Sequence, residues 1–265
     1  MRTLILILVL LISQILVTNV YTQDIRNVPT DSTLLNPIDT VKTFYRLLRE
    51  KRYLEGFRLS VYRSAIESLN QEELKELEPD FETTFANIPE MVKVFGSQVS
   101  GDKATVFIKA SEDPKDYTAE EVALIRVDKQ WVVGDADTLK LVNDLGRKFF
   151  FKVRMDVNEE TAHKFMDRYI GAEKLFFDNN KGVYGNIDDL IGAGYWPENL
   201  KSGEINGYKF TIELENNRKT FWVHAEPITY NKTGHSSFYG DLSGVYKFDN
   251  GGRVYRVQLK TESAK

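Results

Sequence analysis

The sequence contains no cysteine, and this absence removes several kinds of chemistry at once. Disulfides, thiolate nucleophiles, cysteine-ligated zinc and a lipidated cysteine behind a leader are all excluded. Histidine is also scarce, with 3 in 265 residues. The net charge of −4 lacks the basic excess that binding to a phosphate backbone requires, so we expect no nucleic-acid partner.

Long apolar runs are also rare, and the clearest one lies at the N-terminus. Arg2 precedes the run LILILVLLISQILV at residues 4–17, which has the charged and apolar parts of a secretory signal. A bilayer span needs about 20 residues, so we predict a signal peptide over residues 1–22, with an uncleaved anchor at residues 4–20 left open. Residues 23–37 are polar and read as a linker.

An exported chain without disulfides is typical of the bacterial envelope, so we predict a periplasmic or extracellular location. The only predicted membrane contact is through the N-terminal segment. With 42% apolar and 28% charged residues, the remaining chain has the composition of globular protein and the length for two domains.

The first predicted domain, residues 38–150, begins with helical periodicity. The pattern predicts one helix over 39–57 and a second over 61–69. Asn70 followed by Glu73 is a capping-box pattern, which opens a third helix that should stop near Pro79.

The hydrophobic period then changes from helical spacing to alternation. Strands are predicted over 91–100, 102–111, 118–128 and 130–135, joined by turn residues into an antiparallel meander. Helices followed by such a meander predict an α+β domain.

Two segments, DTVKTFYRLLREKRYLEGF and EEVALIRVDKQWVVGD, resemble the opening helix and closing hairpin of the NTF2-like (SnoaL-like) superfamily. The resemblance implies a cone of helices and curved antiparallel sheet around a pocket. The cone would hold a small apolar ligand on the side chains of Tyr45, Phe57, Tyr62, Phe107 and Trp131. An ordinary filled core explains the same aromatic residues.

The second predicted domain, residues 151–265, opens with a helix over 159–177 that Asn158 would cap. Strands are expected after it, with a further one at 253–259. The four main predicted strands are 208–214, 219–227, 236–241 and 245–249.

The segments LIGAGY, GYKFTI, FWVHAEP and SFYGDLSGV resemble the globular part of type IV pilins and type II secretion pseudopilins. The matching positions are Ala225, Pro227, Ser237, Phe238, Tyr239, Asp241, Ser243 and Gly244. The resemblance implies a helix packed on an antiparallel sheet and a protein partner in the cell envelope. Residues 4–20 lack the acidic residue of a pilin's assembly segment, so we expect a pilin-like domain and not a filament subunit.

The stretch HSSFYGDLSGVYKFDNGG at 235–252 places His235, serines and Asp241 close together. A hydrolase would need a nucleophile on a strained elbow, and the spacing here is G-x-x-S-G instead of G-x-S-x-G. Tight turns at 242–244 and 249–252 explain the glycines and asparagine, and we adopt that interpretation. No catalytic residue is therefore assigned.

Acidic residues in the stretch DNNKGVYGNIDD suggest a metal site. Val183 stands where an EF-hand needs glycine, which excludes that motif. A different calcium site that uses Asp178, Asp188 and Asp189 is left open. His163, with Glu159 and Asp167 one turn away on either side, is interpreted as part of a solvated helix face.

These observations predict an exported, non-catalytic binding or assembly module, with a role as an accessory of a secretion or pilus-like system. The alternative is an NTF2-like protein that binds or weakly transforms a small molecule in its cone pocket.

Overall fold

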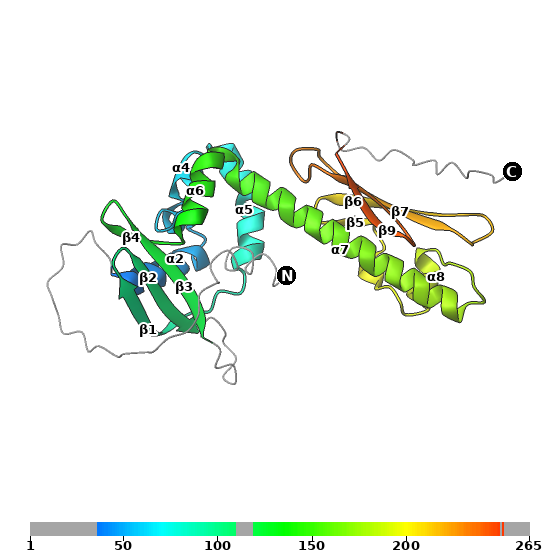
Figure 1. Ribbon diagram of the computed structural model, residues 1–265, viewed down its shortest axis with the longest axis horizontal. Helices are drawn as coiled ribbons and strands as arrows, with labels where there is room; N and C mark the ends of the chain where they lie inside the picture. Colours follow the sequence, from blue (N-terminus) through cyan, green and yellow to red (C-terminus); the bar gives the residue numbers. More distant parts are fainter. Residues whose placement is uncertain (1–35, 110–118, 250, 252–265) are drawn as a thin grey trace. The chain divides into compact units, whose positions relative to one another are not determined.

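The computed structural model describes residues 36–109, 119–249 and 251 of the chain (Figure 1). They form helices and two antiparallel sheets, which confirms the predicted mixed α+β class. The chain divides into two compact units, residues 1–150 and residues 151–265. The predicted signal or anchor and the predicted strand 253–259 lie outside the described residues. None of the described helices combines the length and apolar character needed to cross a bilayer.

Two short helices replace the single helix predicted over 39–57. α2 (Pro37–Arg49) is followed by a left-handed residue, Lys51, and then by α3 (Tyr53–Phe57). The amides of Lys51 and Arg52 donate to Leu48 and Leu47 carbonyls at 3.1 and 2.9 Å. This is a Schellman C-cap with lysine at the position where glycine is usual, so periodicity alone gave no sign of the break.

α4 (Arg63–Glu67) precedes α5 (Gln71–Phe85), whose capping box is confirmed. Glu73 N donates to Asn70 Oδ1 at 2.9 Å, and Asn70 N donates to Glu73 Oε2 at 3.0 Å. The prediction that the helix stops near Pro79 is wrong, because α5 continues through it. Leu77 and Phe81 are buried on either side, and their packing outweighs the hydrogen bond that proline removes.

The first sheet consists of β1 (Lys93–Ser100), β2 (Lys103–Lys109), β3 (Glu120–Val127) and β4 (Gln130–Val133). They pair antiparallel in chain order, which confirms the predicted meander.

One face of this sheet carries the buried residues Ala104, Val106, Val122 and Leu124, and α2 packs against the sheet. The outer edge of β4 is covered, because Val133 exchanges backbone hydrogen bonds with the segment 59–61.

α6 (Ala136–Leu145) and the 3-10 turn η1 (Gly146–Lys148) lead into the long helix α7 (Phe149–Asn179). α7 therefore begins well before the predicted residue 159, and Asn158 lies inside the helix, where it donates to Thr233 O at 2.8 Å. The reason is burial: Phe149 and Phe150 are part of an aromatic cluster of the first unit.

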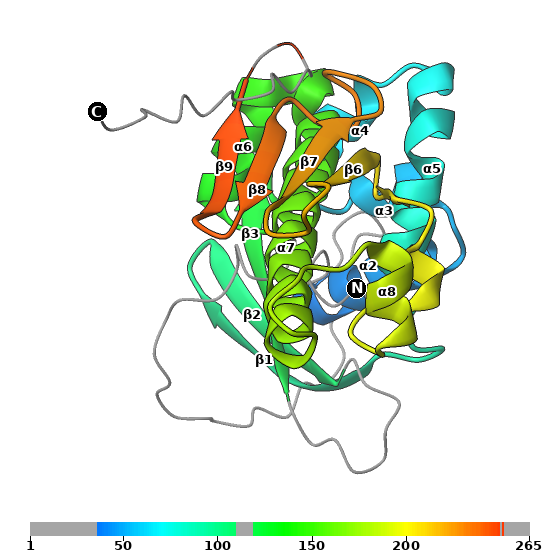
Figure 2. The ribbon, with the colours of Figure 1, turned by 90° about the vertical axis from the view of Figure 1, so that its right-hand side faces the viewer.

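In the second unit, α7 runs along a five-stranded antiparallel sheet of order β5-β6-β7-β8-β9 (Figures 1 and 2). In chain order, α8 (Ile187–Gly192) and η2 (Glu198–Leu200) follow α7 and precede the first strand of this sheet. The strands are β5 (Glu204–Ile205), β6 (Tyr208–Leu214), β7 (Phe221–Pro227), β8 (Ser237–Asp241) and β9 (Gly244–Phe248).

β6 to β9 confirm the four main predicted strands, whereas β5 was missed. β5 joins β6 through Asn206 and Gly207, which have φ of 44° and 73°. An Asn-Gly pair with two left-handed residues makes a tight hairpin turn. The apolar side of α7 and the inner side of the sheet form one core, which includes Phe165, Met166, Tyr169, Phe210, Phe221, Val223 and Phe238.

Candidate functional site

The five residues predicted to line a cone pocket have different surroundings in the first unit. Phe57 and Tyr62 are packed among other rings, with centroids 5.1 Å from Phe150 and 5.3 Å from Phe149 respectively. Phe107 alternates with the buried Val106 and therefore lies on the opposite face of the sheet.

Trp131 and Tyr45 complete the predicted set. The guanidinium of Arg126 lies 4.5 Å from the centroid of the Trp131 ring, a cation–π contact. Tyr45 is on α2 and is half-buried.

Both tyrosines of the predicted pocket are poorly suited to act as bases. Burial, together with the charge of Glu120, raises the pKa of Tyr45 above its ordinary value. Burial and the charge of Asp135 raise the pKa of Tyr62 in the same way. Because a general base must lose its proton near the working pH, these phenols remain neutral hydrogen-bond donors instead.

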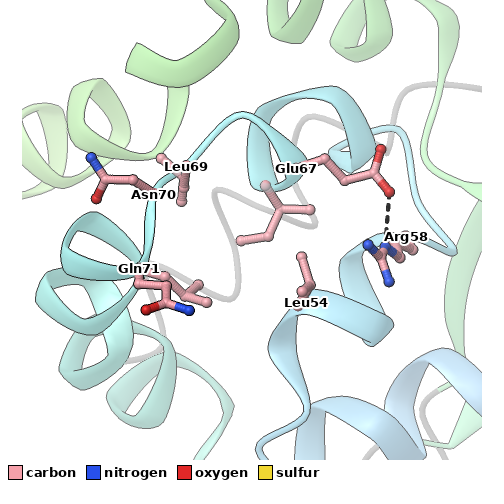
Figure 3. Close-up of a pocket in the computed structure, with 8 residues that line it drawn as sticks. Leu54, Arg58, Glu67, Leu69, Asn70 and Gln71 are labelled. Carbon is pink, nitrogen blue, oxygen red and sulfur yellow. Dashed lines mark hydrogen bonds and ion pairs between the residues drawn. The ribbon is translucent and has the colours of Figure 1, made fainter.

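A hollow of about 220 Å³ lies among α3, α4 and the start of α5 (Figure 3). Leu54 projects into it from α3, and Leu69 and Gln71 approach from the other side. Arg58 Nε donates to Glu67 Oε1 at 2.8 Å along one margin. The residues that line the hollow are Leu54, Arg58, Ile66, Glu67, Leu69, Asn70, Gln71 and Leu74.

A second hollow of about 470 Å³ adjoins the first and shares Leu54, Gln71 and Leu74 with it. The remaining residues that line it are Lys51, Arg52, Tyr53, Glu55, Lys75 and Glu78. We call the two hollows together the α3–α5 groove. None of the five predicted pocket residues lines it.

The α3–α5 groove combines an apolar floor with a margin of both charges. Leu54, Leu69 and Leu74 are half-buried and Ile66 is buried, so they offer apolar surface. Charged residues of the margin form ion pairs, such as Arg52 with Glu55 at 3.0 Å. This chemistry suits contact with an apolar side chain or small molecule, with polar groups around the contact.

In the second unit, Asp241 and Ser243 of the 235–252 stretch belong to a tight turn. Asp241 Oδ1 accepts from Ser243 N at 2.7 Å, and Tyr239 donates to Asp241 Oδ2 at 2.9 Å. Gly244, with φ of 137°, pairs with Asp241 where β8 turns into β9, which confirms the predicted turn at 242–244.

His235 contacts other partners. Its Nδ1 lies 2.7 Å from Asn231 Oδ1, and its Nε2 lies 2.9 Å from Asp249 Oδ2. These contacts are separate from those of Asp241 and Ser243. They do not form the hydrogen-bonded chain of nucleophile, histidine and acid that a triad requires.

Two of the three aspartates considered for calcium, Asp188 and Asp189, form ion pairs with basic side chains. Asp188 Oδ1 lies 2.6 Å from Lys201 Nζ, and Asp189 Oδ2 lies 2.5 Å from an Arg218 nitrogen. Asp189 also forms a capping box with Asn186 at the start of α8. Asp178 is exposed near the end of α7. Throughout 36–109 and 119–249, no three His, Asp or Glu side chains are grouped so as to hold a metal ion.

Two buried glutamates on α7 have contacts that the sequence did not predict: Glu159, considered there only as a neighbour of His163, and Glu173, which was not considered. Glu159 Oε1 accepts from the amides of His235 and Ser236 at 2.8 and 3.0 Å, and its Oε2 lies 2.8 Å from Lys247 Nζ. His163, one turn further, instead pairs with Asp167 at 2.9 Å on the exposed side.

Glu173, about four turns further along α7, is fully buried. It accepts from the Tyr169 hydroxyl at 2.8 Å and from Gly185 N at 3.0 Å. Both glutamates hold loops onto the helix.

No protein-family model matches the chain, and no curated protein or solved structure is detectably similar to it.

Proposed function

We propose that the protein is an exported, non-catalytic binding or assembly module of the bacterial cell envelope, which binds a protein partner or a small apolar ligand in the α3–α5 groove. The observation that carries the proposal is that both buried glutamates of α7 bind structural partners within the fold. The carboxylate of Glu159 accepts from two backbone amides and pairs with Lys247, and that of Glu173 accepts from a backbone amide and from Tyr169. Both groups therefore stabilise the fold.

A cone-pocket enzyme is less well supported. Phe57 and Tyr62, two of the residues that would line such a cone, pack against each other and against Phe149 and Phe150, and burial keeps the phenols of Tyr45 and Tyr62 protonated. An active site needs groups that converge on a reacting atom, and the groove offers ion pairs around an apolar floor instead.

We also propose that the first unit is NTF2-like and the second pilin-like. In the first unit, helices are followed by a four-stranded meander, and this order supports the NTF2-like assignment. The long helix against a five-stranded antiparallel sheet supports the pilin-like assignment of the second unit. An accessory role in a secretion or pilus-like system follows from that second likeness alone.

A photo-crosslinking amino acid at Leu74, in the groove, tests the function in the bacterium that encodes the protein. We expect a discrete cross-linked product that a second substitution in the groove, Leu54→Asp, abolishes without unfolding the protein, because both leucines are half-buried. The matched control places the same amino acid at Leu141, which is 42% exposed on α6 and outside the groove.

Equal cross-linking from residues 74 and 141, or products that persist after Leu54→Asp, would contradict the groove as the binding site. Recovery of the full-length chain from the cytoplasm, with residues 1–22 intact, would contradict export.

A further inference from the structure

Glu173 connects α7 to the loop that follows it. Its side chain is buried with 0% exposure, one turn after Tyr169 on the helix. One carboxylate oxygen accepts from Tyr169 at 2.8 Å, and the other accepts from Gly185 N at 3.0 Å. The loop is therefore held to the helix by a carboxylate that has no access to water.

The titratable and charged groups around Glu173 come from several elements. Tyr169 faces it from α7, Tyr184 from the loop, Arg218 from the β6–β7 turn and Asp189 from α8. Arg218 lowers the cost of the negative charge, but its guanidinium donates to Tyr184 O at 2.8 Å and to Asp189 Oδ2 at 2.5 Å. Asp189 adds a second negative charge to the same neighbourhood.

Glu159 provides the comparison within the same helix. It too is buried and accepts from loop amides, but Lys247 forms an ion pair with it at 2.8 Å. Burial raises the pKa of Glu159, and Lys247 with the two amides more than offsets this, so the pKa is lowered overall. At Glu173 burial prevails and raises the pKa to about 6.

We propose that Glu173 is a proton-operated latch for the loop 180–186: binding of a proton to its carboxyl group tightens the loop on α7, and loss of the proton loosens it. A neutral carboxyl keeps an acceptor for the Gly185 amide and removes a charge that the buried site solvates poorly. The latch does not depend on what the α3–α5 groove binds.

The sign and size follow from proton linkage. An open loop exposes Glu173 to water, where its pKa is near 4.5, whereas the closed loop gives about 6. The closed form therefore binds the proton more tightly, and closure is favoured as the pH falls from above 6 towards 4.5. The closing equilibrium gains about 15-fold between pH 7.5 and pH 4.5, with a limit of about 30-fold at lower pH.

Amide hydrogen exchange of the full chain, followed by NMR, tests the latch. We expect the protection factor of the Gly185 amide, corrected for intrinsic exchange, to rise about 15-fold from pH 7.5 to pH 4.5. In Glu173→Gln, which keeps the size and one acceptor but does not titrate, the Gly185 protection should not change with pH. Glu160→Gln is the control, because Glu160 is on the same helix in an exposed ion pair with Lys164.

The proposal is overturned if Gly185 protection in the natural protein is flat over this range, or if Glu173→Gln keeps the natural slope. A ¹³C titration of the Glu173 carboxyl in the natural protein serves as a second measurement, which needs no variant. A midpoint close to that of an exposed glutamate would also overturn it.

Discussion

Replacement of Glu159 by alanine should destabilise the second unit far more than removal of its ion-pair partner. The carboxylate accepts from the amides of His235 and Ser236 at 2.8 and 3.0 Å, as well as from Lys247. Alanine leaves both amides without this acceptor, whereas Lys247→Ala leaves them bonded.

The magnitude follows from burial. Ser236 is 4% exposed, so its orphaned amide costs about 1–3 kcal/mol, and the amide of the more exposed His235 adds about 1 kcal/mol after water replaces the carboxylate. We therefore expect Glu159→Ala to lower the free energy of unfolding by about 2–4 kcal/mol. The Lys247 side chain is 58% exposed, so Lys247→Ala should cost below about 1 kcal/mol.

Urea unfolding of the full chain measures the difference, with tryptophan fluorescence and far-ultraviolet circular dichroism as probes. Trp196 and Trp222 lie in the second unit and Trp131 lies in the first. The fluorescence of a variant without Trp131 therefore reports unfolding of the second unit, and that of a variant without Trp196 and Trp222 reports unfolding of the first. Glu159→Gln keeps an acceptor for the amides and should fall between the two variants. Equal losses from Glu159→Ala and Lys247→Ala would refute the reasoning, because the ion pair would then account for the whole effect.

Two further predictions concern the first unit. Phe57→Ala should cost about 3–5 kcal/mol in urea unfolding, because the ring is 1% exposed among other aromatic rings. Phe95→Ala, at a position 58% exposed, is its control and should change stability by less than about 0.5 kcal/mol; similar losses would contradict the packing described. Asn70→Ala should cost about 1 kcal/mol through loss of the α5 capping box, seen as a lower urea midpoint, and an unchanged midpoint would contradict a role for the cap.

Local signals in the sequence were sufficient where the deciding interactions are local. The capping box of Asn70 and Glu73 joins residues three apart, and the turn at Leu242–Gly244 needs only its own glycine and aspartate. The alternation of β2 and β3 likewise follows from one buried face.

The predicted helix bounds were wrong where packing against distant residues overrides a local rule. Pro79 normally ends a helix, yet Leu77 and Phe81 keep α5 continuous because both are buried in the core. Asn158 has the chemistry of an N-cap, but burial of Phe149 and Phe150 starts α7 earlier.

The candidate sites were hard to predict for the same reason. In the sequence, Asp188 and Asp189 have the chemistry of metal ligands. In the fold, Asp188 pairs with Lys201 and Asp189 pairs with Arg218, and both basic residues are distant in sequence. The groove leucines are spaced like any helical core residue, and only the arrangement of α3 and α5 leaves them half-exposed.

The continuity of α7 decides how the two units can be studied apart. Its first residues, Phe149 and Phe150, pack with Phe57 and Tyr62, while the stretch from Ala162 to Phe176 packs on the second sheet. A cut between residues 150 and 151 would fall within the helix and leave the second fragment with four unbonded amides at a new, uncapped end. A first fragment that continues to residue 158 and a second that begins with α6 both keep the natural start of α7 inside the fragment, so isolated-unit experiments should use overlapping ends.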